Sequence, residues 1–142
     1  MFAESKSYQQ KHIALKPQDP QPYYSIGVID WTLAYRANTQ LRMQFNQSVG
    51  GDGLKDQDPL PEVLRQEYVR QYGPLVDEGI ESLNRAIQLK ADYEDAMIYL
   101  NLLYRRKADT LSDSPSRNEY VQMADDLVEK VKDIKMKRLG SE

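Results

Sequence analysis

The sequence predicts an all-α protein of about five helices, and three observations carry this prediction. Apolar residues recur at three- and four-residue intervals along most of the 142 residues. Clusters of proline, glycine and aspartate separate these periodic segments. No segment alternates apolar and polar residues at strand spacing. We therefore expect helices that are joined mostly by short loops and packed into one domain over residues 1–142.

A proline-rich turn separates the first two expected helices. Residues 3–16 combine apolar positions with good helix formers, and three prolines between residues 17 and 22 then end that helix. Proline lacks the backbone N–H that a helix interior requires and biases the preceding residue away from the helical conformation. From Tyr23 to about Met43 the apolar residues return at helical intervals, which predicts a second, longer helix.

Residues 44–61 are the one expected loop, inserted between two helices. The segment contains three glycines, three aspartates and two prolines, a composition that favours turns. Asp52, Asp56 and Asp58 suggest calcium, because hard cations are bound by carboxylate oxygens. The alternating oxygen ligands and closing Glu of an EF-hand are missing, however, so we predict a solvated turn and no metal site.

Two helices with continuous apolar spacing follow the loop. Residues 62–89 keep that spacing for almost 30 residues, and Gly73 and Pro74 are expected to bend this helix. Residues 91–108 carry apolar side chains around much of the helix circumference. A helix of that kind needs cover on more than one side, so we expect it to be sandwiched.

The last expected helix covers residues 116–137, with Asp113 or Ser114 as its N-cap. Its end is crowded with cations: Lys130, Lys132, Lys135, Lys137 and Arg138. Cations there interact favourably with the negative end of the helix dipole, which accounts for most of the cluster. Contact with an acidic partner or an anionic membrane surface is the alternative.

Composition and charge disfavour several classes of function. The 22 acidic and 19 basic side chains give a net charge of -3, without the clustered cationic face that nucleic acid binding needs. The absence of cysteine removes disulfides, thiolate metal ligands and cysteine nucleophiles, but leaves the compartment open. No apolar stretch approaches the roughly 18 residues of a membrane span, and residues 1–10 lack the apolar core of a secretory signal. We expect a soluble protein and, because the sequence starts inside an expected helix, a piece of a longer chain.

The sequence favours a non-enzymatic protein without a cofactor. His12 is the single histidine, and no serine lies in a recognisable nucleophile motif, so no catalytic triad can be assembled. Asp77, Glu78 and Glu81 lie within about one helical turn. Carboxylates need burial or a charge partner to act as a general acid and base, and on an amphipathic helix we expect them to be solvated.

Two segments of the chain share one internal spacing. Met97 lies 74 residues after Tyr23, just as Ala91 lies 74 residues after Pro17. At the same offset, Ile26 and Gly27 in the first segment correspond to Leu100 and Asn101 in the second. A repeated spacing of this kind is the sequence signature of a helical repeat.

The shared positions resemble the tetratricopeptide (TPR) pattern of a large residue, then Leu and a small residue, then Tyr. The most specific match is the string GIESLNRAIQLKADYEDAMIYLNLLY, residues 79–104. The resemblance implies antiparallel helix hairpins in a short right-handed array, in which the small residues Gly79 and Ala86 admit Leu100 and Tyr104 of the neighbouring helix.

The chain also departs from the TPR pattern. A typical repeat has roughly 34 residues, so the offset of 74 implies some 40 additional residues within the first hairpin. Asp30 stands where the family has Tyr, Ala91 replaces the usual Pro, and Asn101 replaces a small residue. The final helix matches only loosely.

The resemblance implies a groove, lined by the first helix of each hairpin, that holds an extended peptide or a partner helix. The corresponding positions here are Tyr24, Val28, Trp31 and Thr32 in one helix and Asp95, Ile98, Leu102, Arg105 and Arg106 in the other. Aromatic residues and arginine are enriched at interface hot spots. The structural alternative is that Trp31, Ile98 and Leu102 are core residues. The Lys and Asn clamp by which some TPR domains grip a terminal carboxylate is not matched.

We therefore expect a protein–protein interaction scaffold whose peptide or protein partner the sequence does not identify. The first alternative is a structural module that self-associates into a homo-oligomer. The second is a small-molecule or metal-dependent activity, which predicts a deep pocket with converging polar groups and shifted pKa values.

Overall fold

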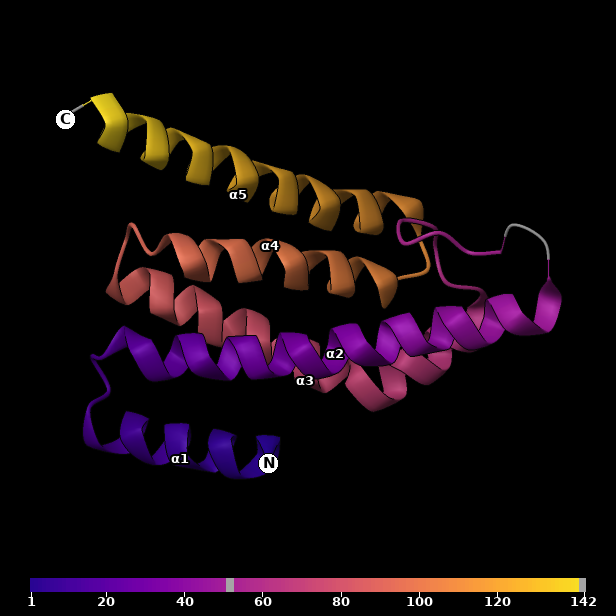
Figure 1. Cartoon of the computed structure of the whole chain (residues 1–142), viewed down its shortest axis with the longest axis horizontal. Coiled ribbons are helices and arrows are strands. Elements are labelled where there is room, and N and C mark those ends of the chain that lie inside the picture. Colours follow the sequence, from indigo (N-terminus) through magenta and orange to yellow (C-terminus); the bar gives the residue numbers. More distant parts are fainter. Residues whose placement is uncertain (51–52, 141–142) are drawn as a thin grey trace.

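The computed structural model describes residues 1–50 and 53–140, and within them it contains five α-helices and no strand, which confirms the all-α prediction (Figure 1). The helices are α1 (Phe2–Leu15), α2 (Pro20–Val49), α3 (Glu62–Leu89), α4 (Glu94–Asp109) and α5 (Ser114–Gly140). Helix α3 runs unbroken through Pro74. The bend expected at that residue stays a prediction.

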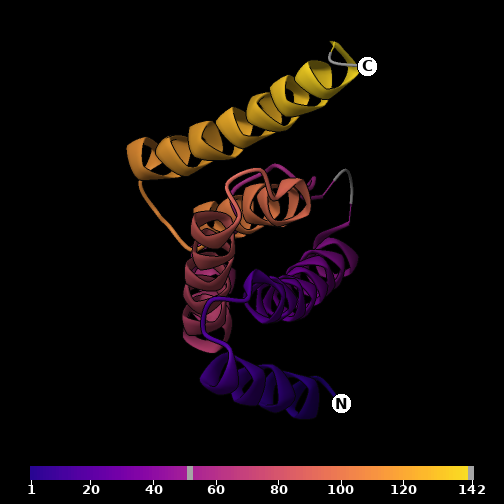
Figure 2. The same ribbon diagram turned by 90° about the vertical axis from the view of Figure 1, so that its left-hand side faces the viewer.

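Successive helices run in opposite directions and pack side by side (Figure 1). Helices α2 and α3 form the longest pair, and α4 packs against both of them. The two ends of the arrangement are α1, which packs on α2, and α5, which packs on α4 (Figure 2). Helix α4 is thus covered on more than one side, as its apolar circumference predicts.

Side-chain caps begin two of the helices. Asp19 precedes α2, and its carboxylate accepts a hydrogen bond of 3.0 Å from the backbone N–H of Gln21. Asp113 precedes α5 and accepts one of 2.9 Å from the N–H of Ser116. Of the two residues that the sequence offers as the cap of the last helix, Asp113 therefore fills the role.

Helix α2 is longer than predicted, because residues 44–49 belong to it and not to the loop. The helix ends at Gly50, whose φ of 70° suits glycine better than any other residue. Asn46, in the last turns, accepts a hydrogen bond of 2.5 Å from the N–H of Leu54 and donates one of 3.0 Å to its carbonyl. These bonds tie the returning loop to the helix and favour its extension. Gly51 and Asp52 lie outside the described residues, so the predicted solvated turn is described only from Gly53 onward.

Two glycines bring α2, α3 and α4 into close contact. A methyl group at Gly27 of α2 would lie 2.3 Å from Cγ of Leu83 in α3. At Gly79 of α3 it would lie 2.7 Å from Leu103 of α4 and 2.9 Å from Cβ of Asp30 in α2. Such distances leave no space for a side chain.

The neighbours of Gly79 differ in detail from the expected ones. Leu103 and Asp30 lie against it, whereas the sequence suggests Leu100 and Tyr104. Leu100 and Tyr104 are nevertheless buried in the same core. Helix α4 packs on α2 as well as on α3, and this double contact turns the Leu103 side of α4 toward Gly79.

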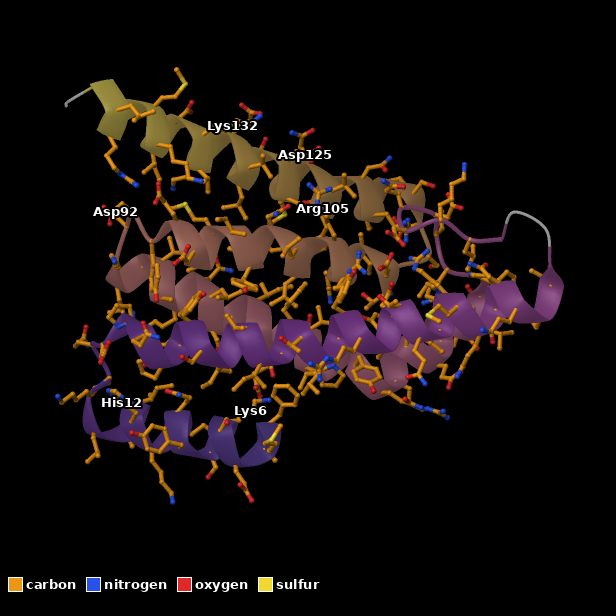
Figure 3. All side chains as sticks on the ribbon, in the orientation of Figure 1. Lys6, His12, Asp92, Arg105, Asp125 and Lys132 are labelled. Atoms are coloured by element: carbon orange, nitrogen blue, oxygen red, sulfur yellow. The ribbon has the colours of Figure 1, made fainter. Side chains whose placement is uncertain are left out.

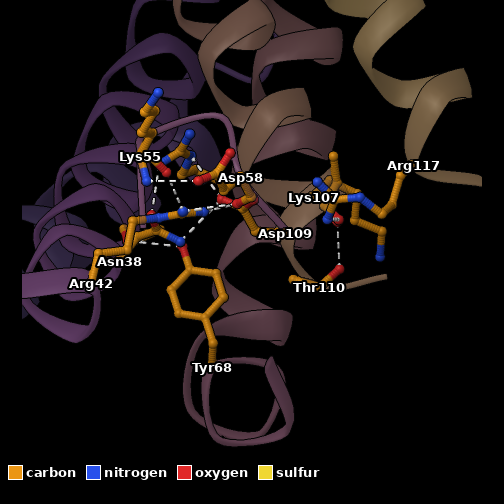
Figure 4. A network of polar contacts seen from close by, with 12 residues as sticks. Asn38, Arg42, Lys55, Asp58, Tyr68, Lys107, Asp109, Thr110 and Arg117 are labelled. Atoms are coloured by element: carbon orange, nitrogen blue, oxygen red, sulfur yellow. Dashed lines mark hydrogen bonds and ion pairs between the residues drawn. The ribbon is translucent and has the colours of Figure 1, made fainter. Parts of the chain in front are cut away.

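A buried polar network holds the C-terminal half of α2. Arg42 donates hydrogen bonds to the carbonyls of Lys55 (2.7 Å) and Asp58 (2.8 Å) in the loop, to the side chain of Asn38 (2.8 Å) and to Asp109 of α4 (3.2 Å) (Figure 4). The guanidinium thereby joins α2, the loop and the end of α4. We call this set the Arg42 network.

Candidate partner-binding surface

Five aromatic rings form a continuous strip where α2 meets α4. We define the aromatic strip as Tyr24, Trp31, Tyr35, Tyr93 and Tyr99. The Tyr24 ring lies 5.2 Å from that of Tyr93 and 5.8 Å from that of Tyr99, and Trp31 lies 5.4 Å from Tyr99 and 5.1 Å from Tyr35, between ring centroids. The edge-on contacts of Tyr99 with Tyr24 and Trp31 are a favoured geometry of aromatic pairs.

Helical spacing places the α2 members of the strip on one face. Tyr24, Val28, Trp31 and Tyr35 follow one another at intervals of four, three and four residues, which puts them in one row along the helix. Tyr24, Val28 and Trp31 are half-buried, and Tyr35 is exposed. The strip is thus partly packed and partly open. Trp31 is neither a fully buried core residue nor a fully exposed groove residue, the two interpretations that the sequence allows.

The chemistry of the strip combines apolar faces with hydroxyl groups. Burial, with smaller contributions from Tyr99 and Asp95, raises the pKa of Tyr24 to about 12. Burial also raises the pKa of Tyr93. Both phenols therefore remain protonated at neutral pH, and the Tyr93 hydroxyl donates a hydrogen bond of 3.1 Å to the side chain of Gln21.

The apolar members of the predicted groove on α4 keep part of their surface open. Ile98 is 37% exposed and Leu102 is half-buried, while Asp95 in the first turn is exposed. The hydroxyl of Thr32 on α2 donates to the carbonyl of Val28 at 2.7 Å, so this donor is already used within the helix. The predicted residues from α2 and α4 thus belong to two helices in direct contact.

The two predicted arginines do not form a free cationic rim. Arg106 donates to the side chain of Asn38 at 3.0 Å and lies over the ring of Tyr35, which fastens α4 to α2. Arg105 donates to Asp125 at 2.8 Å and fastens α4 to α5 (Figure 3). Both guanidinium groups have intramolecular partners, and their predicted role in binding stays a prediction.

A cleft lies between α1, α2 and α3, apart from the aromatic strip. It is an open cleft of about 650 Å³, lined mostly by polar side chains: Gln10, Tyr23, Glu78, Glu81, Asn84 and Arg85. At its edge, Lys6 of α1 forms ion pairs with Glu78 and with the buried Asp30, the latter at 2.9 Å (Figure 3). Asp30 itself does not line the cleft.

The environment of Asp30 shifts its titration strongly. Burial raises its pKa to about 7, Lys6 opposes this shift, and the neighbouring Glu78 adds to it. A carboxyl group with a pKa near neutrality is suited to acid–base chemistry only where a substrate can reach it. Asp30 is fully buried, so its environment is that of a structural ion pair.

The other residues singled out from the sequence have simple roles. His12 of α1 lies 3.0 Å from the carboxylate of Asp19, which ties α1 to the following turn (Figure 3). Asp77 pairs with Lys107 at 2.8 Å, and Glu81 is exposed. In the described part of the chain, no three acidic or histidine side chains converge in a group that could hold a metal ion. No helix there combines the length and apolar character needed to cross a membrane.

Comparisons with protein families, with curated proteins and with solved structures find no match to this chain. Its function is therefore inferred from its own residues.

The structure adds three aromatic residues that the sequence did not single out as binding residues. Tyr35 follows Trp31 by four positions, a spacing that puts both on one helix face. The sequence places Tyr93 and Tyr99 on the apolar faces of the helix expected over residues 91–108. Their contacts with α2 depend on the crossing of two helices about 70 residues apart, and a periodic pattern contains no information on that crossing.

Proposed function

We propose that this chain is a protein–protein interaction scaffold of TPR-like architecture, which binds a peptide or a helix of a partner protein along the face shared by α2 and α4. The aromatic strip is the observation that carries the proposal. It is half-open, and Ile98 and Leu102 are further apolar side chains on α4 with exposed surface.

Three features support a TPR-like architecture. The helices follow one another antiparallel, and α4 packs on both members of the preceding pair. Glycines at positions 27 and 79 occupy the closest approaches between helices, as small residues do in the TPR pattern. The 74-residue spacing relates α2 to α4, the two helices that present the strip.

The chemistry of the strip suits an apolar ligand with polar backbone groups. Aromatic rings offer a large contact area at a low cost in conformational entropy, and Tyr and Trp are enriched among binding hot spots. The phenol hydroxyls can hydrogen-bond to the backbone of an extended peptide. The half-buried state of Trp31 means that part of its ordering cost is already met before binding.

Affinity capture with variants tests the proposal. We expect Trp31→Ala and Leu102→Ala proteins to keep the helical circular dichroism spectrum and to lose the partner that the parent chain retains. Val63→Ala is the matched control, because Val63 is 76% exposed on α3 and lies outside the strip. Unaltered capture profiles for both strip variants would count against the proposal. Trp31 is the only tryptophan, so its fluorescence gives a second readout of binding.

Self-association is the second candidate function. It is favoured by the exposed apolar side chains at the end of α5, where Met136 and Leu139 are each 70% exposed. In that case the chain forms a concentration-dependent oligomer, and a Met136→Lys, Leu139→Lys protein is monomeric. Light scattering that shows a strict monomer at high concentration removes this candidate.

A further inference from the structure

Helices α4 and α5 enclose an open groove of about 260 Å³ at the end of the molecule. Its lining is mainly apolar, with the amide of Asn101 among five apolar side chains: Met97, Ile98, Leu127, Val128 and Val131. Lys132 and Lys135 of α5 complete the lining (Figure 3). The groove is thus a hydrophobic trough with two lysines along one wall, of which Lys132 also pairs with Glu129 at 3.2 Å.

The same chain shows what fills an equivalent groove. The preceding helix pair, α2 and α3, is covered by α4. Ile98 lies 74 residues after Tyr24, and the two residues differ in their cover. Tyr24 packs against Tyr93 and Tyr99 at α4, whereas Ile98 is 37% exposed. The element that fits such a trough is therefore an α-helix that presents aromatic and aliphatic side chains.

The walls of the groove are braced before anything binds. Glu94 of α4 pairs with Arg138 of α5 at one end, and Arg105 pairs with Asp125 near the other. These two ion pairs join the helices on either side of the groove. A preformed groove binds a ligand with a smaller loss of conformational entropy than one that must open.

The charge of the two lysines in the groove wall favours some helices over others as a ligand of the groove. The lysines favour a helix with acidic side chains facing α5. Helix α4, the occupant of the equivalent groove, begins with Glu94 and Asp95 in its first turn, whereas its last turn carries Arg106 and Lys107. Helix α1 of a second copy carries Lys6 and Lys11 and would bring like charges together.

We propose that the α4/α5 groove docks an acidic amphipathic helix from a partner protein. The groove shares Ile98 with the surface of the proposed function, but none of its other lining residues belongs to the aromatic strip. Occupancy of one surface therefore does not require occupancy of the other.

A peptide with the sequence of residues 90–104 is a suitable probe, with its ends blocked. It contains the turn before α4 and the apolar first part of that helix, and its one lysine and three acidic residues give it a net negative charge. We expect saturable binding in an NMR titration of the whole chain, with the largest shifts at Val128 and Val131. Absence of saturation at about 1 mM peptide overturns the proposal, as do shifts centred on Gly27 and Gly79, which would mean that the peptide replaces α4 itself.

Charge variants sharpen the test and do not threaten folding, because Lys132 is largely exposed. Lys132→Glu with Lys135→Glu should weaken peptide binding about 10-fold, and a peptide in which Glu94 and Asp95 are replaced by Lys should recover it. Val63→Glu on α3 is the control and should leave the affinity unchanged. Equal affinities for the parent and the lysine variants contradict the proposal. So does a dimer of the free chain that Val128→Glu dissociates, because the occupant is then a second copy.

Discussion

The two halves of α2 are held in place by different interactions. The first half, residues 20–35, packs closely through Gly27 against Leu83 and contributes three rings to the aromatic strip. The second half, residues 36–49, buries polar side chains, and Arg42 is its centre. One half thus depends on shape and the other on hydrogen bonds.

Two buried aspartates, one beside each half of α2, differ in the same way in their charged partners. Asp109 faces the second half, where burial raises its pKa and the two arginines Arg106 and Arg42 oppose that shift. Asp30 lies in the first half, where only Lys6 of α1 opposes burial and Glu78 reinforces it. The second half is therefore a fixed brace. The first half carries the aromatic strip. Its buried Asp30 carboxylate depends on a single cation, Lys6 of the terminal helix α1.

The largest expected effect comes from breaking the brace. Arg42→Ala removes all four hydrogen bonds of the guanidinium and leaves Asp109 buried without one of its cations. We expect a loss of about 3–5 kcal/mol in the free energy of unfolding, measured by urea denaturation. Arg70→Ala, an exposed change on α3, is the control and should cost less than about 0.5 kcal/mol. A loss of under about 1 kcal/mol for Arg42→Ala would mean that the network is not a brace.

Close packing in the first half predicts a smaller effect. Gly27→Ala places a methyl group 2.3 Å from Leu83, so we expect a loss of about 1–3 kcal/mol despite the higher helix propensity of alanine. Gly73→Ala on α3 is the matched change, because its methyl would meet Val69 at an ordinary 3.6 Å. Its effect should stay below about 1 kcal/mol, since the gain in propensity is opposed by the following proline. Thermal unfolding of the two variants tests the contrast, and equal shifts would contradict it.

The titration of Asp30 predicts a pH-dependent difference. Its native pKa of about 7 lies above the ordinary 3.8, so the native state binds the proton more tightly than the unfolded chain. The corresponding stability is present below about pH 4 and is lost as the pH rises through about 7. Asn cannot lose this proton. The free energy of unfolding of Asp30→Asn minus that of the parent should therefore increase by about 1–3 kcal/mol between about pH 4 and about pH 8. A difference that does not vary with pH would show that Asp30 titrates normally.

The smallest expected effect concerns α1. This helix contains no buried residue, and Lys6 provides its ion pairs to α2 and α3. Lys6→Met should raise the hydrogen exchange rates of residues 2–15 while those of α3 and α4 stay the same. Lys11→Met, on an exposed position of α1, should change neither. Faster exchange throughout the molecule would instead show that α1 supports the whole core.

Periodicity predicted the helices because it records apolar burial, and residues such as Leu83 and Leu100 repeat with the helix. It did not predict the last turns of α2, where Asn46 and the loop residue Leu54 provide the stabilising contacts. A glycine-rich composition beyond Gly50 made these turns look like loop.

For the candidate site too, the sequence predicted residues on one helix face but not their contacts with distant residues. Tyr24 and Trp31 were identified through the resemblance, and they lie on the α2/α4 face. Arg106 looked like a free surface charge because its partner Asn38 is 68 residues away. Polar networks of this kind join residues far apart in the sequence, so no local sequence pattern predicts them.

Hydroxyl-radical footprinting of the chain with its captured partner tests the central claim most directly, because it reports the solvent access of individual side chains. If the partner lies on the α2/α4 face, oxidation of Trp31 and Tyr35 falls on binding, while oxidation of Tyr8, which is 67% exposed on α1, is unchanged. Equal oxidation of Trp31 and Tyr35 in the free and bound chains would contradict the claim.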